Sequence, residues 1–334
     1  MHMADALLAP SVAAVMCAGS VITAGYSVKK IRLEDNPVKI PEMGVMGAFV
    51  FAAQMINFTI PGTGSSGHLT GGMLLSALLG PYAGFISMIG VLLIQCLFFA
   101  DGGIMALGAN IWNMAFYGCF VGGGIIWKIA MKNGASKKKI CAAGILGCVV
   151  SMQLGAFSVT VETLASGITE LPFTAFLAAM QPIHLAIGLV EGIITSAVLI
   201  FVYEAQPKLI WGINDNNDNG RTPVKKVFAV TGICTVIIAG AVSLVASALP
   251  DGLEWSVARV ADDAEITAAG GIYDVLSEIQ NKLAVMPDYA FKHSDTAAGT
   301  SVSGIAGAAI VFTVCILCCY LFRLFRKRRN HEKA

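Results

Sequence analysis

The second residue of the chain is a histidine, and this position gives it a particular chemistry toward metal ions. The Met1 amine, the deprotonated amide of His2 and the Nδ1 atom of its imidazole can bind one ion through two adjoining chelate rings. These nitrogens lie in one plane, so that a further nitrogen completes a square. Square-planar nitrogen coordination suits Ni(II) or Cu(II), whereas oxygen-rich octahedral sites suit Mg(II) or Mn(II). The start of the chain therefore favours a nickel chelate, with cobalt and copper as alternatives.

A loop histidine, His68, is the candidate for the completing nitrogen. It lies in the glycine-rich stretch 61–72, which can fold back toward a helix bundle. Metal-bound imidazoles usually need polar neighbours that fix the ring. The candidates for this supporting role are Asn57, Thr63, Ser65, Ser66, Asp101 and Asn110. Taken singly, His2 is also explained by chance, and His68 by a hydrogen bond to the loop backbone.

His184 and Glu191 form a second candidate pair. They are seven residues apart in an apolar segment and hence share one face of a helix. Ionisable groups inside a membrane are costly and indicate function by default. We interpret them as pathway or coupling residues, and the alternative is an interhelical hydrogen bond that only fixes packing.

The composition places these residues in a membrane protein. The 334 residues are 56% hydrophobic and 13% charged, and the mean hydropathy is +0.73, where soluble domains carry roughly 25% charged residues. Nearly all of the nine cysteines fall in apolar stretches, so we expect packing and no disulfides. The basic runs are short and border apolar segments, which argues against nucleic-acid binding. The chain has no Gly-Lys dipeptide and therefore no P-loop, and no His-Glu-x-x-His motif.

Nine apolar segments of spanning or near-spanning length predict an all-α membrane protein with about nine transmembrane segments. They lie near 9–28, 44–60, 69–81, 83–100, 107–131, 139–161, 182–203, 227–248 and 302–322. The segment 69–81 is short and glycine-rich, and it is either a broken helix or half of a re-entrant hairpin. Pairs of glycines four residues apart, Gly118 with Gly122 and Gly188 with Gly192, predict close helix packing.

The positive charges predict the orientation of these segments. The first lysine, Lys29, follows the first apolar run, so this run is a helix that starts outside the membrane and is not a signal peptide. Alternation from that start puts 19 of the 22 Lys and Arg residues on the cytoplasmic side. Such a bias is typical of a correct topology, with the N-terminus outside and the C-terminus inside.

A turn-rich stretch around 214–220 divides the chain into two modules. We predict a seven-helix bundle over 1–205, a cytoplasmic linker over 206–225, and a helical pair over 226–334. The pair flanks an outer segment, about 250–300, that carries nine acidic and three basic residues. This segment is either a solvated connector or a small folded cap that docks on the first module or concentrates cations.

The motifs around these candidates resemble the substrate-specific M component of cobalt/nickel energy-coupling factor transporters. The resemblance covers about residues 1–205, and its motifs are Met1-His2-Met3-Ala4-Asp5, Asn57 to Gly72, Asp101-Gly102-Gly103, Asn110-x-x-Asn113-Met114 and His184-x-x-x-Gly188-x-x-Glu191-Gly192. The second module resembles the small N component of the same systems, and Pro250-Asp251-Gly252-Leu253-Glu254 matches its PDGLE-type version.

The resemblance implies a seven-helix bundle in the plasma membrane of a prokaryote, with the N-terminus inserted from outside. It implies metal ligation by the amine of Met1, the backbone and side chain of His2, and His68. It also implies a transmembrane coupling (Q-type) subunit and cytoplasmic ATP-binding cassette ATPases as partners. The transported Ni(II) or Co(II) would be the substrate, and the chain would be no enzyme and hold no permanent cofactor. Met3 and Ala6 depart from the family pattern, which bears on metal preference.

Two other functions remain open at this point. An ion-coupled secondary carrier of a small solute would use Glu191 and His184 as proton sites and would need no ATPase. The halves of the chain show no sequence echo of the kind that carriers with inverted repeats have. A membrane enzyme would use His68 or Cys315, but no nucleophile and base fall together on one side of the predicted topology.

Overall fold

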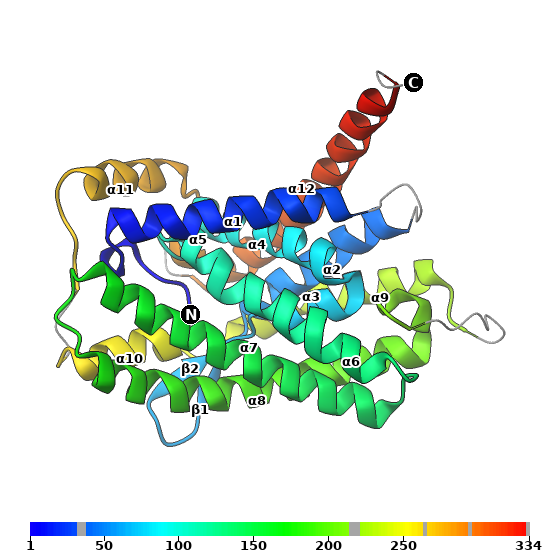
Figure 1. Ribbon diagram of the computed structural model, residues 1–334, viewed down its shortest axis with the longest axis horizontal. Helices are drawn as coiled ribbons and strands as arrows, with labels where there is room; N and C mark the ends of the chain where they lie inside the picture. The colour runs from blue at the N-terminus through cyan, green and yellow to red at the C-terminus, as the bar shows by residue number, and fades with distance from the viewer. Residues whose placement is uncertain (32–37, 214–220, 263–265, 293–295, 332–334) are drawn as a thin grey trace.

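The computed structural model describes residues 1–31, 38–213, 221–262, 266–292 and 296–331. The stretch 214–220, the centre of the predicted linker, lies outside the described residues. Long helices that run side by side dominate the structure (Figure 1). In the described ranges, seven helices are long and apolar enough to cross a membrane: α1 (Pro10–Lys30), α4 (Pro81–Phe99), the continuous helix Leu107–Met131, α7 (Lys137–Ser166), α8 (Phe173–Ala205), Val224–Val245, and Ala297–Arg323.

Several of these spans are built from more than one element. The helix Leu107–Met131 consists of α5 (Leu107–Asn110), a π-helical stretch over Ile111–Trp127 and α6 (Lys128–Met131). The span Val224–Val245 consists of α9 (Val224–Gly240) and a short 3-10 turn, and the last span is part of α12 (Ala297–His331).

Two further apolar segments form helices that are too short to count among these seven membrane-spanning candidates. They are α2 (Lys39–Gln54), with 16 residues, and α3 (Gly72–Leu79), with eight residues that are all buried. Between them, β1 (Phe58–Ile60) and β2 (Ser65–Gly67) form an antiparallel hairpin in which Ile60 pairs with Ser65. The segment predicted at 69–81 is therefore a short buried helix that leads directly into α4.

Glycines allow the helices to approach closely. A β-carbon at Gly118 would lie 2.8 Å from the α-carbon of Gly72 in α3, and one at Gly192 would lie 2.6 Å from the α-carbon of Ile145 in α7. Neither distance is tolerable for a real side chain, so any larger residue would force the helix backbones apart. The prediction of close packing at the paired glycines is confirmed.

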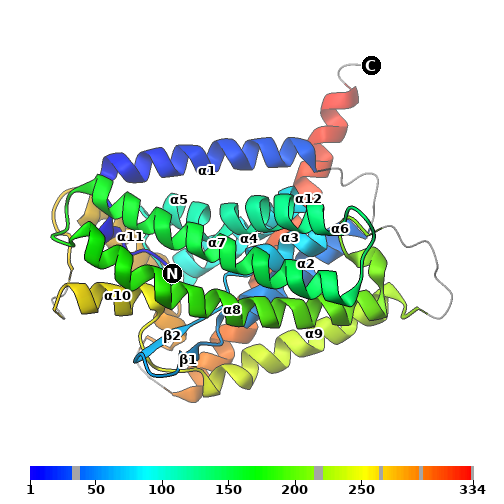
Figure 2. The same ribbon diagram turned by 60° about the horizontal axis from the view of Figure 1, so that its bottom comes forward.

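The C-terminal helices α9 and α12 pack against α2. Of the two, α9 lies on the side of the bundle away from α1, whereas α12 runs across the bundle (Figure 2). Between them, the outer segment forms α10 (Gly252–Val260) and α11 (Ile272–Leu283). A capping box starts α10: the Asp251 carboxylate accepts the Glu254 amide, and the Glu254 carboxylate accepts the Asp251 amide. Since α10 also packs on α8 and β2, the described part of the segment 250–300 forms a cap docked on the first module, which favours the second of the two alternatives.

Candidate metal centre

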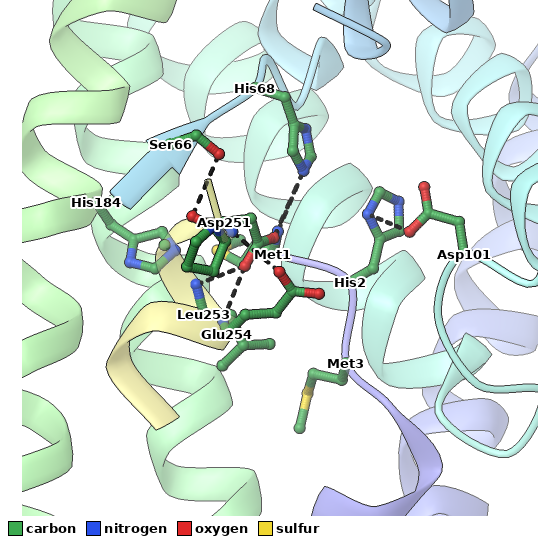
Figure 3. Close-up of polar contacts among 12 residues, drawn as sticks. Met1, His2, Met3, Ser66, His68, Asp101, His184, Asp251, Leu253 and Glu254 are labelled. Carbon is green, nitrogen blue, oxygen red and sulfur yellow. Dashed lines mark hydrogen bonds and ion pairs between the residues drawn. The ribbon is translucent and has the colours of Figure 1, made fainter. Parts of the chain in front are cut away.

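The N-terminal residues are inserted into the bundle, where the side chains of Met1 and Met3 are 4% and 0% exposed. Asn110 holds this segment from both sides: its side chain accepts the Met3 amide at 2.7 Å and donates to the Met3 carbonyl at 3.2 Å. Asp5 accepts the backbone amide of Ala106 at 2.9 Å. These bonds fix the terminal amine at the centre of the site (Figure 3).

His68 follows β2 and faces this amine. Its Nδ1 atom lies 3.0 Å from the carbonyl oxygen of Leu69, and its Nε2 atom lies 3.2 Å from the Met1 nitrogen. A hydrogen on Nδ1 donated to Leu69 leaves a lone pair on Nε2 that points to the amine. Neighbouring nitrogens in a square of bonds about 2 Å long are about 2.8 Å apart, so the two atoms are already nearly at ligand spacing.

The imidazole of His2 stacks on that of His68, with ring centroids 5.3 Å apart. Its Nδ1 atom lies 3.1 Å from Asp101 and its Nε2 atom 3.2 Å from the side-chain oxygen of Gln95. Burial outweighs the attraction of Asp101 and lowers the pKa of His2 to about 4. The lowered pKa favours the neutral ring that a metal ligand needs, but chelation through Nδ1 requires the imidazole to turn away from Asp101.

A buried chain of amides links His2 to the loop after His68. Gln95 donates to Gln54 at 3.1 Å, and Gln54 donates to the carbonyl oxygen of Thr70 at 2.8 Å. Glu191 accepts the amide of Thr70 at 3.0 Å, its hydroxyl at 2.8 Å, and the amide of Gly71 at 2.9 Å. Both carboxylate oxygens are thus used to hold this loop. The sequence did not single out the two glutamines, although polar side chains in apolar helices are the signal that could have found them.

The PDGLE stretch supplies a group that the sequence analysis did not place in the site. The Asp251 carboxylate forms an ion pair with the Met1 amine, and its Oδ2 atom lies 3.7 Å from Nε2 of His68. Burial opposes its ionisation, but the amine and His68 hold the pKa of Asp251 well below its usual range. The hydroxyl of Ser66 donates to the carbonyl of Leu249 at 2.7 Å, and the Ser66 amide donates to that of Pro250 at 2.8 Å. These bonds fix the cap to the hairpin.

His184 is buried beside this cluster (Figure 3). Its Nδ1 atom lies 2.8 Å from the carbonyl oxygen of Met180, and its Nε2 atom has no hydrogen-bond partner among the described residues. The backbone carbonyl of Asn57 accepts the amide of Ser247 at 2.8 Å, and its side chain has no hydrogen bond among the described residues.

A cavity of about 620 Å³ lies between the bundle and the docked cap, and His2 and His68 are part of its wall. We call it the outer cavity. None of the described residues that line it is a lysine or an arginine, whereas five carry carboxylates: Asp5, Asp101, Asp251, Glu254 and Asp288. A cavity wall whose charged side chains are all acidic raises the local concentration of cations. The outer cavity can therefore collect hydrated metal ions next to the N-terminus.

Within the described part of the chain, no group of three or more His, Cys, Asp or Glu side chains is arranged to hold a metal ion. The nitrogens of the N-terminal backbone are further candidates for ligands at this place. The geometry brings the Met1 amine and His68 together, keeps His2 beside them, and places Ser66, Asp101 and Asn110 where each fixes a neighbour.

Comparison with known proteins identifies the family of the chain. The family model described as the cobalt uptake substrate-specific transmembrane region matches residues 2–209, and the PDGLE domain model matches residues 225–324. A putative fused nickel transport protein of Archaeoglobus fulgidus is 35% identical over 318 residues, which cover 94% of this chain and 96% of that protein. The fused nickel transport protein of Rhodobacter capsulatus is 28% identical over 338 residues, which cover 93% and 95%.

A crystal structure of a truncated transition metal transporter aligns with a TM-score of 0.53 at 33% identity. The alignment covers 61% of this chain and 99% of that one. The first family model alone covers more than half of the chain, and the Archaeoglobus relative extends over both parts. The chain is therefore a multi-pass membrane protein that belongs to the CbiM family of cobalt and nickel transport proteins, with a PDGLE domain on the C-terminal side of the family region.

Proposed function

We propose that the chain is the substrate-binding subunit of an ATP-driven importer of the energy-coupling factor type, and that it captures Ni(II), or Co(II), at the outer face. Four nitrogens bind the ion: the Met1 amine, the His2 amide, Nδ1 of His2 and Nε2 of His68. The observation that carries this proposal is the 3.2 Å distance between the amine and Nε2 of His68, deep in the site.

The proposed topology has nine membrane segments, an outside N-terminus and an inside C-terminus. The M-type component comprises 1–205, the linker 206–225, and the N-type component 226–334. The positive charges support this orientation, because 19 of 22 then lie in the cytoplasm. In this account, α2 and α3 cross or partly cross the membrane as helices shielded by protein, which their burial supports.

The proposed cycle begins when a hydrated ion enters the acidic outer cavity. The ion loses its water as His2 turns from Asp101 and the amine leaves Asp251. Preformed nitrogen ligands bind such ions tightly and release protons in doing so. Release to the cytoplasm then needs an energy source. A coupling subunit and ATP-binding cassette ATPases supply it, and the absence of a P-loop in this sequence supports a division of labour between subunits.

We expect nickel uptake to depend on ATP and on the partner subunits. The purified chain in liposomes should move no ⁶³Ni, and addition of the coupling subunit and ATPases with ATP should start accumulation. The His2→Ala variant of the complete complex should accumulate almost none, because it lacks the Nδ1 ligand and the chelate ring that this nitrogen closes with the backbone amide. Accumulation driven by a proton gradient with the chain alone would contradict the proposal and would favour the secondary carrier that uses Glu191 and His184.

A further inference from the structure

One buried nitrogen has no role in the proposed chelate. His184 is 1% exposed, and its Nδ1 atom is engaged by the Met180 carbonyl at 2.8 Å. Metal-bound histidines almost always donate their other ring hydrogen to such an acceptor. The remaining atom, Nε2, is buried without a partner among the described residues, an arrangement that normally costs folding free energy. The imidazole therefore has the arrangement of a metal ligand.

A small cavity of about 10 Å³ lies beside this imidazole. We call it the inner cavity, and its wall includes Met1, His68, His184 and Asp251. Its volume corresponds to about one water-sized particle. A hydrated ion cannot enter it, whereas a dehydrated divalent ion can. The inner cavity thus differs in kind from the outer cavity of about 620 Å³, although His68 and Asp251 belong to both.

The docked cap reaches this cavity through a glycine. A β-carbon at Gly252 would lie 3.2 Å from Nε2 of His184 and 2.8 Å from the Cδ1 atom of Ile187. Only the missing side chain lets the PDGLE backbone approach the histidine so closely. The same approach carries the Asp251 carboxylate into contact with the Met1 amine and within 3.7 Å of Nε2 of His68.

We propose that His68, His184 and Asp251 form a second cation position next to the N-terminal chelate, which holds a dehydrated transition-metal ion in transit. The inference rests on the proposed function. Two imidazole nitrogens and one carboxylate oxygen suit Ni(II), Co(II) or Zn(II). These side chains are not yet arranged around one point in the structure, because Asp251 is paired with the Met1 amine. The set assembles when Asp251 turns from the amine to an arriving ion.

The transfer is a ligand exchange without a redox step. The bonds from the ion to the Met1 and His2 nitrogens break, and bonds to Nε2 of His184 and to the Asp251 oxygen form. His68 remains bound throughout, because it belongs to both positions. The amine and the amide take up protons again as the ion leaves them. The ion therefore never stands free in the apolar interior.

The second position can be measured after the chelate is removed. In the His2→Ala variant of the full chain, we expect Co(II) to bind weakly to one position, with the optical spectrum of a nitrogen and oxygen environment. Adding His184→Gln or Asp251→Asn should each weaken this residual binding at least about tenfold. Adding Asp274→Asn, a change in the same outer segment on α11, should leave it unaltered.

A transport measurement separates this role from a structural one. In the complete complex, His184→Gln should leave the equilibrium affinity for Ni(II) within about twofold and slow uptake at least about tenfold, with an unchanged unfolding temperature. If His184→Gln changed neither the residual Co(II) binding nor the rate of uptake, the second position would be overturned while the chelate stands. Full affinity in the His2→Ala variant would instead overturn the proposed function itself.

Discussion

Two serines inserted between Met1 and His2 should abolish tight nickel binding. The insertion keeps every histidine but separates the imidazole from the terminal amine, so that the two chelate rings no longer share one amide nitrogen. One inserted residue is not enough, because a histidine in the third position makes a square-planar chelate of its own with two amides. We expect the dissociation constant to rise at least about a thousandfold, which corresponds to about 4 kcal/mol.

Isothermal titration of the purified chain with Ni(II) measures this change. The matched control carries the same two serines after Gly134, in the exposed turn that joins α6 and α7. This control should bind nickel as the unmodified chain does. Equal affinity of the two insertion variants would show that the ion is held elsewhere and would remove the basis of the chelate.

Replacing Glu191 by alanine should cost about 3 kcal/mol of folding free energy and most of the nickel affinity. The carboxylate accepts two backbone amides and the hydroxyl of Thr70, and its loss leaves buried donors unpaired. The loop that presents His68 is then no longer fixed. Glu191→Gln should show a smaller loss, since it keeps one good acceptor.

Denaturant unfolding of the detergent-solubilised chain measures the stability, and nickel titration measures the binding. Glu204→Ala on the same helix is the control: its carboxylate pairs with Lys137 at the exposed end of α8 and should contribute little. If Glu191→Ala left stability and nickel affinity intact but stopped transport, the residue would act as a proton site, and the carrier function would gain support.

The sequence predicted much of the site because metal chemistry depends on residue type and position. His2 next to a free amine and His68 in a glycine-rich loop were recognisable, and the structure places them in one cluster. The lengths of α2 and α3 were harder to predict, since hydropathy does not show where a buried helix stops. Both segments are apolar over their length, yet only the packing around them decides the boundaries.

Asp251 shows which contacts a local sequence pattern does not predict. In the sequence it is part of the PDGLE-type motif, and in the structure its side chain caps the start of α10. Its second contact, with an amine 250 positions away, depends on how two modules dock, which no local pattern reveals. The contact of His2 with Asp101 also joins residues far apart in the chain, although both belong to the first module. Metal ligation by Met1, His2 and His68 and a pathway role for His184 stay predictions.

The most direct test of the central claim is X-ray absorption spectroscopy of the nickel-loaded full chain with its native Met1. Four nitrogen neighbours in a plane, with the pre-edge feature of a square-planar centre, are the result that the N-terminal chelate predicts. A six-coordinate ion with mainly oxygen neighbours would contradict it, because the ion would then sit among the carboxylates of the outer cavity.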